Sequence, residues 1–261
     1  MNLASTNRIK LGIVSALPQE QDGIVAQMQD KHVEQHGMRS YTCGTLWGID
    51  CVCVLARIGK VGAAATTTML IAQFGVSHIL FTGVAGGASE HVKVGDIVVA
   101  GDLVQHDMDC SPLFPRYEIP LTGKTLFGAD AALSETLALA CSDFLQHDFP
   151  NTIAAEEKLE FALHAPKVHR GLIASGDEFI KERAKMAQIK ESWPQLLAVE
   201  MEGAAVAQVC HEFDLPFAVM RTISDGSNEE SAVDFVRFID KVAARYAYAV
   251  LQRVCMRLAQ A

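Results

Sequence analysis

Carboxyl groups at distant places in the chain could carry out acid–base chemistry. Asp225 ends the apolar run from Phe217 to Ile223 and follows Ser224. Burial at the end of such a strand raises the pKa of a carboxyl group and allows it to deliver a proton. Glu20 follows the first apolar run of the chain, although its Gln-Glu-Gln-Asp context is also typical of a solvated helix start. Its position after a strand makes Glu20 a candidate.

Two further acids lie where a predicted strand gives way to a predicted helix. Glu200 and Glu202 flank Met201 at this point. The unpaired N–H groups and the dipole at a helix N-terminus hold a carboxylate in its ionised form. An ionised carboxylate only accepts hydrogen bonds, so it suits vicinal hydroxyl groups such as those of a ribose. An ordinary acid in the first turn of a helix is the alternative, more so for Glu200 than for Glu202.

The glycine cluster at residues 83–87 could let backbone approach a ligand closely, but a tight turn after a strand explains it equally well. It lacks the G-x-G-x-x-G spacing of dinucleotide sites, and no suitable acidic residue follows about 20 positions later. Residues 123–125 (GKT) lack the first glycine of a phosphate-binding P-loop, because position 118 is Glu. We therefore expect neither NAD nor a P-loop nucleotide.

Two histidine-containing segments have the composition of a metal site but not its spacing. Residues 106–109 (HDMD) alternate at a strand end without a second His nearby. His32 and His36 are four positions apart on a predicted helix, and Val33 takes the place of the Glu that zinc proteases need. No G-x-S-x-G motif is present, and no Cys lies in a nucleophile context. We expect no catalytic metal, no cofactor and no acyl-enzyme chemistry.

Short apolar runs predict the strands that position these groups. Ile9 to Ala16 is typical of a buried strand, and Pro18 then suits the first turn of a helix. Two β-rich runs around Gly48 predict a hairpin, at residues 38–47 and 49–58. Further short strands are predicted at residues 77–81, 96–100, 168–174, 196–199 and 217–223.

Helical patterns lie between several of these strands, at residues 60–74, 129–145, 203–213 and about 233–258. The last is amphipathic, with Ser231 and Asp234 as a capping box. Its apolar stripe comprises Phe235, Phe238, Ile239, Val242, Tyr246 and Val250. The alternation predicts an α/β fold: a single three-layer α/β/α domain over residues 1–261, with a central mixed, mainly parallel twisted sheet and a flexible N-terminus at residues 1–8.

In open α/β sheets, ligands bind beyond the carboxyl ends of the strands, and the acids described above follow such ends. The irregular stretch from Ser111 to Phe127 contains three prolines, and long loops of this kind are often lids.

Composition limits the class of partner. The chain has 261 residues, of which 50% are hydrophobic, and a net charge of −9, which predicts a soluble globular protein without a nucleic-acid or anionic-membrane surface. The longest nearly apolar run, residues 61–72, is shorter than the roughly 20 residues that span a bilayer, and the first eight residues lack a secretory pattern. Seven cysteines without a C-x-x-C pair predict reduced, buried thiols. We expect a cytoplasmic protein with a small-molecule ligand.

Seven motifs, in order along the chain, resemble the purine nucleoside phosphorylase superfamily and, within it, the 5′-methylthioadenosine/S-adenosylhomocysteine nucleosidases. They are residues 11–20 (LGIVSALPQE), 58–63 (IGKVGA), 82–87 (TGVAGG), 93–99 (KVGDIVV), 175–180 (SGDEFI), 199–205 (VEMEGAA) and 221–225 (RTISD). The resemblance implies a nucleoside phosphorylase-like fold and hydrolysis of an adenine N-glycosidic bond through an oxocarbenium-like transition state, without a cofactor.

The resemblance also implies roles for individual residues. Asp225 would be the general acid toward adenine N7, and Glu20 would orient and deprotonate the attacking water. Glu202, with Met201, would hold the ribose hydroxyl groups and stabilise the positive sugar.

The remaining residues implied by the resemblance bind the substrate. The backbone of Phe179 and Ile180 would contact the adenine edge, and the Phe179 ring would stack on the base. Gly86, Glu200 and Ser224 complete this set.

Two other functions stay open. A phosphorylase would need arginines near the first turn and before the central glycine motif, where none lies, although Arg57 could be a phosphate ligand. A non-catalytic nucleoside-binding protein would have no use for an acid and a base on opposite sides of the bond. The 5′-substituent is not fixed by the sequence: methylthio, homocysteinyl, 5′-deoxy and 6-amino-6-deoxyfutalosine substrates are all conceivable. The resemblance further implies a homodimer in which residues 112–114 wall the 5′ pocket.

Overall fold

A computed structural model describes residues 9–226, 235 and 237–260. The predicted flexible N-terminus at residues 1–8 and the capping box of Ser231 and Asp234 lie outside this range. In the described residues the strands are β1 (Lys10–Ser15), β2 (Gln29–His36), β3 (Arg39–Leu46), β4 (Ile49–Leu55), β5 (His78–Gly87), β6 (Ile97–Gln105), β7 (Phe127–Gly128), β8 (Val168–Ser175), β9 (Leu196–Glu200) and β10 (Phe217–Asp225).

The helices in the same part of the chain are α1 (Pro18–Ala26), α2 (Lys60–Ala72), α3 (Ala131–Asp143), α4 (Phe149–Thr152), α5 (Ala155–Glu160), α6 (Arg183–Ser192), α7 (Gly203–Glu212) and α9 (Ala244–Leu258). Two π-helical turns, Phe144–Asp148 and Ile239–Ala243, precede α4 and α9. Pro18 is the first residue of α1, as predicted. The predicted helix at residues 129–145 is therefore shorter than expected and continues as a π turn.

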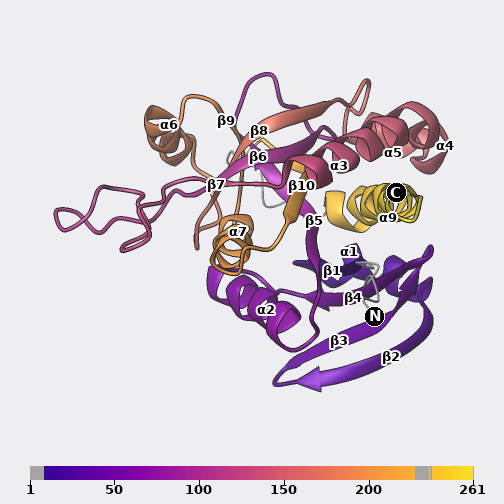
Figure 1. Ribbon diagram of the computed structural model, residues 1–261. Coiled ribbons are helices and arrows are strands. Elements are labelled where there is room, and N and C mark those ends of the chain that lie inside the picture. Colours follow the sequence, from indigo (N-terminus) through magenta and orange to yellow (C-terminus); the bar gives the residue numbers. More distant parts are fainter. Residues whose placement is uncertain (1–8, 227–234, 236, 261) are drawn as a thin grey trace.

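Strands and helices form the mixed α/β architecture that the sequence predicts. The strands join in one sheet, in the order β10-β6-β8-β9-β5-β1-β4-β3-β2, with β7 paired to β6. The hairpin predicted around Gly48 is β3 and β4, which pair antiparallel. Helices α1, α3 and α9 pack together on one face, and α2 and α7 pack on the other (Figure 1).

Alternation of side chains along each strand divides the core into two apolar layers. In β4, Cys51 and Cys53 join the cluster beneath α3 and α9, whereas Val52 and Val54 join the cluster beneath α2 and α7. Successive side chains of a strand point to opposite faces, so a strand covered on both sides is apolar throughout. This is why the sequence shows these strands as continuous apolar runs.

The final helical segment buries the apolar stripe that the sequence predicts. Phe238, Ile239, Val242, Tyr246 and Val250 are buried in the cluster beneath α3 and α9, and Phe235 is half-buried against it. The stripe crosses the π turn before α9, so the segment is not one regular helix in the described residues.

Part of the sheet closes on itself, which a simple open sheet does not do. β5 pairs with β10, β10 with β6, β6 with β8, β8 with β9, and β9 again with β5. The closing pairs are Gly86 with Val199 and Gly87 with Ala198, and they run antiparallel. The carboxyl ends of β5 and β9 therefore arrive from opposite directions and overlap at one place.

Two segments differ from the sequence-based expectation. Residues 29–36 form the edge strand β2, so the prediction of a helix carrying His32 and His36 was wrong. Pairing with β3 gives this polar segment a partner that its own pattern does not reveal. β5 continues through the glycine cluster to Gly87, so the cluster is the end of a strand and not a turn after it.

Candidate active site

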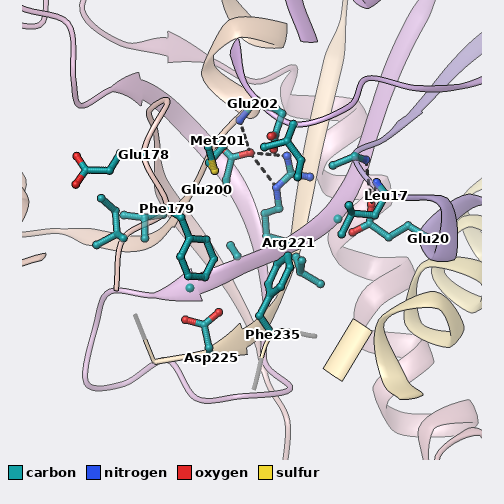
Figure 2. A pocket seen from close by; sticks show the side chains of 18 residues that line it. Leu17, Glu20, Glu178, Phe179, Glu200, Met201, Glu202, Arg221, Asp225 and Phe235 are labelled. Carbon is teal, nitrogen blue, oxygen red and sulfur yellow. Dashed lines mark hydrogen bonds and ion pairs between the residues drawn. The ribbon is translucent and has the colours of Figure 1, made fainter. Parts of the chain in front are cut away.

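A cavity of about 300 Å³ lies where the overlapping ends of β5 and β9 meet β10 (Figure 2). This volume is at the lower end of the range for small-molecule sites. Eight of the nine predicted site residues line it: Glu20, Gly86, Phe179, Ile180, Glu200, Met201, Glu202 and Asp225. Ser224 is fully buried directly behind Asp225.

Strand register explains how segments far apart in the chain converge here. Gly86 pairs with Asp225 of β10 on one side and with Val199 of β9 on the other. Glu200, the last residue of β9, pairs with Ser175 at the end of β8. The loop that carries Phe179 and Ile180 starts from that end of β8. The closed part of the sheet thus brings the ends of four strands to one cavity.

Glu20 is held by the start of its own helix. Its Oε2 accepts hydrogen bonds from the backbone N–H groups of Ala16 (2.9 Å) and Leu17 (3.0 Å), which cap α1. Oε1 is buried without a hydrogen-bond partner among the described residues. Burial raises the pKa of Glu20 and is the largest effect on it. The N–H of Leu17 and the charge of Arg221 act in the opposite direction, because they favour the carboxylate. Glu20 is thus a buried acid, not the solvated helix-start acid that was the alternative.

Glu200 forms a buried ion pair with Arg221. The guanidinium donates to Glu200 Oε2 from Nη2 (2.6 Å) and Nε (3.2 Å), and both side chains are almost fully buried. The N–H groups of Glu202 and Gly203 at the start of α7 also donate to this carboxylate, as does the hydroxyl of Ser175. Its oxygens are therefore occupied by protein donors, and Glu200 fixes the position of Arg221.

Glu202 differs from the sequence-based expectation. The N-terminal N–H groups of α7 point at Glu200, so the prediction that they hold Glu202 ionised was wrong. The N–H of Gly59 donates to Glu202 Oε1 instead (2.8 Å). Burial, and then the charge of Glu200, raise the pKa of Glu202 to about 8. Its carboxyl group therefore takes up a proton more readily than an ordinary glutamate.

Asp225 is the last residue of β10 and is 2% exposed. The hydroxyl of Ser224 donates to its Oδ2 over 2.8 Å, and the same hydroxyl lies 3.3 Å from the carbonyl of Ala85. Ser224 thus fixes one oxygen of Asp225. A buried carboxyl group at a cavity wall is suited to proton transfer.

Aromatic and apolar groups form another wall of the cavity. The Phe179 ring, 39% exposed, meets the ring of Phe235 edge to face at 5.6 Å between centroids. Ile180 and Met201 also line the cavity, and Met201 is labelled in Figure 2. A flat ring beside acidic groups suits a ligand with an aromatic base at one end and hydroxyl groups at the other.

Arg221 lines the cavity and was not predicted as a site residue. Its guanidinium carbon lies 3.9 Å from the centroid of the Phe81 ring. A Cβ at Gly83 would come within 2.8 Å of Arg221 Nη1 and 3.3 Å of Glu20 Oε1, so glycine is needed where these two side chains approach. The sequence indicates this role in one way: Arg221 is the one charged residue in the mostly apolar run from Phe217 to Ile223.

The two segments considered for metal binding lie outside the cavity. Asp107 accepts a 2.6 Å bond from Lys60 Nζ and one from the N–H of Asp177, so the acid of residues 106–109 is engaged in protein contacts. His32 and His36 lie on β2 at the sheet edge. A lipid bilayer could not be crossed by any helix in the described part of the chain, since none combines the necessary length and apolar character.

The chain matches a known superfamily over nearly its whole length. A sequence profile of the phosphorylase superfamily matches residues 10–255. The chain belongs to this superfamily. One relative is the 5′-methylthioadenosine/S-adenosylhomocysteine nucleosidase of Shewanella sediminis, 34% identical over 245 residues that cover 93% of this chain and 97% of the relative.

Solved structures of nucleosidases with the same name match over nearly the whole chain. The protein from Colwellia psychrerythraea, in complex with adenine, has a TM-score of 0.84 and 30% identity, and the match covers 96% of each chain. The protein from Neisseria meningitidis, in complex with methylthio-immucillin-A, has a TM-score of 0.83 and 29% identity over 95% of this chain and 99% of its own. The family resemblance and the fold class inferred from the sequence are confirmed.

Proposed function

We propose that this protein hydrolyses the adenine N-glycosidic bond of 5′-methylthioadenosine and S-adenosylhomocysteine, releasing adenine and the 5-thio-substituted ribose. One observation carries the proposal: Glu20, Glu202 and Asp225, from three distant segments, line a single cavity that has an aromatic wall. The nucleosidase relatives support it, because they match over 93% or more of this chain.

Asp225 is the general acid. Its carboxyl group protonates adenine N7, which makes the base a better leaving group, and the Ser224 hydroxyl fixes the other oxygen in place. The Phe179 ring stacks on the base, and the backbone of Phe179 and Ile180 contacts its edge. A positioned acid of this kind contributes about 10²–10⁴-fold to a rate.

Glu20 is the general base. Its Oε1 has no hydrogen-bond partner among the described residues and lies close to Arg221, so it is available to accept a proton from the attacking water. The raised pKa of Glu20 makes its carboxylate a stronger base than an exposed glutamate would be. Arg221 lies beside it and keeps enough positive charge nearby for the carboxylate to form.

Glu202 binds the ribose. Its carboxyl group accepts hydrogen bonds from the ribose hydroxyl groups, and Met201 packs beside the sugar. As the sugar becomes positive in the transition state, the ionised form of Glu202 becomes more favourable. Acid and base catalysis at about 10²–10⁴-fold each supply roughly 5–11 kcal/mol, whereas enzymatic accelerations range over roughly 8–23 kcal/mol, so this electrostatic contribution supplies a further share.

The charges at the cavity favour water over phosphate as the nucleophile. Among the described residues that line it, Arg221 is the one cation, and Glu200 occupies its guanidinium. Five acidic residues line the same cavity: Glu20, Glu178, Glu200, Glu202 and Asp225. Arg57, the sequence candidate for a phosphate ligand, donates to the carbonyl of Met38 and is not among the lining residues.

One assay distinguishes hydrolysis, phosphorolysis and simple binding. Purified protein is incubated with 5′-methylthioadenosine, with and without phosphate, and the sugar product is identified. Free methylthioribose formed without phosphate supports the proposal. A sugar 1-phosphate that forms only with phosphate identifies a phosphorylase, and tight binding without turnover identifies a nucleoside-binding protein.

We propose further that the protein acts as a cytoplasmic homodimer built from one domain per chain. The segment between β6 and β7 extends away from the rest of the molecule (Figure 1). It carries Leu113 and Leu121, 83% and 91% exposed, beside Pro112 and Phe114. A second copy that covers this segment would bury them and could close the 5′ side of the cavity. Light scattering on wild type and Leu113→Asp tests this: a dimer is expected for the first, and a weakened dimer with lower activity for the second.

A further inference from the structure

Three potential metal ligands gather on the outer hairpin of the sheet, away from the cavity. β2 is the edge strand, and its alternate residues His32, Glu34 and His36 share one face. Cys43 of β3 lies directly opposite His32 in the strand register. Side chains opposite each other on antiparallel strands are close enough to share a ligand.

The distances fit a tetrahedral site. One ligand atom each from His32, Glu34 and Cys43 all lie within 4.8 Å of one another. His32 Nε2 is 3.4 Å from Glu34 Oε1. Bonds of about 2.0–2.1 Å to nitrogen and oxygen in a tetrahedron place two ligand atoms roughly 3.3–3.4 Å apart. This pair therefore already has the required separation. The Cys43 sulfur lies within 4.8 Å of a ligand atom of each residue and would move by up to roughly 1 Å to reach a tetrahedral position.

We propose that His32, Glu34 and Cys43 form a binding site for one divalent transition-metal ion of the Zn²⁺ type, with water as the fourth ligand. Imidazole, carboxylate and thiolate together select Zn²⁺ over Mg²⁺ or Ca²⁺, which prefer oxygen alone. Cys43 is 7% exposed, whereas the His32 side chain is 65% exposed, so the ion enters from the solvent side.

His36 positions the carboxylate of this site. Its Nε2 lies 3.5 Å from the second oxygen of Glu34, Oε2. The His36 ring is held edge to face against Tyr41 and Phe74, at 5.8 and 5.4 Å between centroids. Metal-binding carboxylates are commonly oriented by such an outer partner.

The ion would act on stability and not on the glycosidic bond. Three strands, β1, β4 and β3, separate β2 from β5. At about 4.8 Å per strand, β2 is roughly 19 Å from β5, one of the strands that line the cavity, and no described residue of β2 or β3 lines it. An ion bound by β2 and β3 joins the edge strand to its neighbour, and a ligand that binds only the folded state stabilises it.

The test uses untagged, reduced protein titrated with Zn²⁺ by calorimetry and with Co²⁺ by absorption spectroscopy, which detects a thiolate bound to cobalt. We expect one ion per chain, a thiolate–cobalt band, and a higher melting temperature with Zn²⁺. Cys43→Ser should abolish the band. His32 is exposed, so His32→Ala should leave the fold intact. Because it removes a direct ligand, it should weaken Zn²⁺ binding by more than the roughly 10–100-fold that loss of an outer partner costs.

Two matched variants separate this site from other thiols and imidazoles. Cys110→Ser changes the half-buried cysteine outside the hairpin, and His91→Ala removes an exposed histidine on another segment. Both should bind Zn²⁺ and Co²⁺ as wild type does. Absence of saturable binding at micromolar ion, or binding that persists in both His32→Ala and Cys43→Ser, overturns the proposal.

Discussion

The backbone N–H of Gly59 donates a 2.8 Å hydrogen bond to Oε1 of Glu202, 143 positions further along the chain. Gly59 has φ +98°, a conformation that other residues rarely adopt. The same turn starts α2, whose first residue, Lys60, donates its N–H to Asp177 on the loop that carries Phe179. One glycine turn therefore positions both the proposed ribose-binding acid and the loop that contacts the base.

Gly59→Ala should impair catalysis more than stability. The added Cβ would lie 3.2 Å from Asp177 Oδ1, and φ +98° with ψ +156° is a conformation almost restricted to glycine, so the strain is roughly 1–3 kcal/mol. Relaxation of this strain moves the N–H away from Glu202, so kcat/KM should fall by about tenfold or more, since about 1.4 kcal/mol corresponds to a factor of ten. Steady-state kinetics and thermal unfolding measure the two effects.

Gly37→Ala is the matched control, because Gly37 also has positive φ (+59°) but has open space around its Cβ position. This φ lies in the left-handed helical region, so Gly37→Ala should lower stability by roughly 1–2 kcal/mol and leave kcat/KM unchanged. An equal loss of kcat/KM in both variants would show that strain alone, and not the contact with Glu202, causes the effect.

Asp225→Asn tests the proposed general acid. The amide cannot deliver a proton to adenine N7, so kcat should fall by about 10²–10⁴-fold, while the affinity for a non-hydrolysable nucleoside should change little. Ser224 can still contact the new side chain, so the site keeps its shape. Single-turnover kinetics and calorimetric titration separate the two quantities. Asp214→Asn, at an exposed position on the surface, is the control. A wild-type kcat in Asp225→Asn rejects this assignment.

Glu202→Gln should change how stability depends on pH. The pKa of Glu202 is raised from 4.5 to about 8 in the folded protein, so the folded state binds this proton more tightly than the unfolded chain does. The resulting stabilisation is present below pH about 4.5 and is lost as the pH rises through about 8. Glu202→Gln has no carboxyl group to titrate, so it does not lose this stabilisation. Relative to wild type, its free energy of unfolding should therefore increase as the pH rises from about 4.5 to about 8.

Thermal unfolding between pH 5 and 9 measures this difference, at roughly 2–4 °C for each kcal/mol in a chain of this size. The two melting curves should diverge up to pH about 8 and then run parallel. The pKa of Glu20 is also raised by burial, so Glu202→Gln keeps the part of the pH dependence of stability that comes from Glu20. Glu191→Gln removes a carboxyl group at an exposed position and is the control. A constant difference at all pH values would contradict a raised pKa for Glu202.

The sequence predicts the architecture well where apolar runs alternate with helical patterns, because burial on both faces requires such runs. It also places eight of the nine predicted site residues at one cavity, since groups that follow strand ends meet there. It does not predict β2, because a polar edge strand has no apolar pattern and depends on pairing with β3. The closure of β9 onto β5 likewise depends on contacts between distant segments.

Side-chain partners are the second limit of sequence-based prediction. Glu200 and Glu202 are two positions apart at the same helix start, and the sequence cannot tell which of them receives the N–H groups of α7. In the structure it is Glu200, because Arg221 lies on the same side and pairs with it. Glu202 instead faces Gly59 of a distant turn.

The pair of Glu200 and Arg221 gives a final prediction about stability. Arg221 is 1% exposed, so Glu200→Gln leaves this buried charge without the carboxylate that accepts its hydrogen bonds. Loss of one partner from a buried ion pair costs about 3–5 kcal/mol. The guanidinium would also shift relative to Glu20, so activity should fall together with the free energy of unfolding.

Urea unfolding of Glu200→Gln and Glu135→Gln makes the comparison. Glu135 pairs with Arg170 on the surface, where the side chains are 55% and 47% exposed, so its loss should cost less than about 1 kcal/mol. Similar losses in the two variants would mean that solvent reaches Arg221 and that its charge does not depend on Glu200.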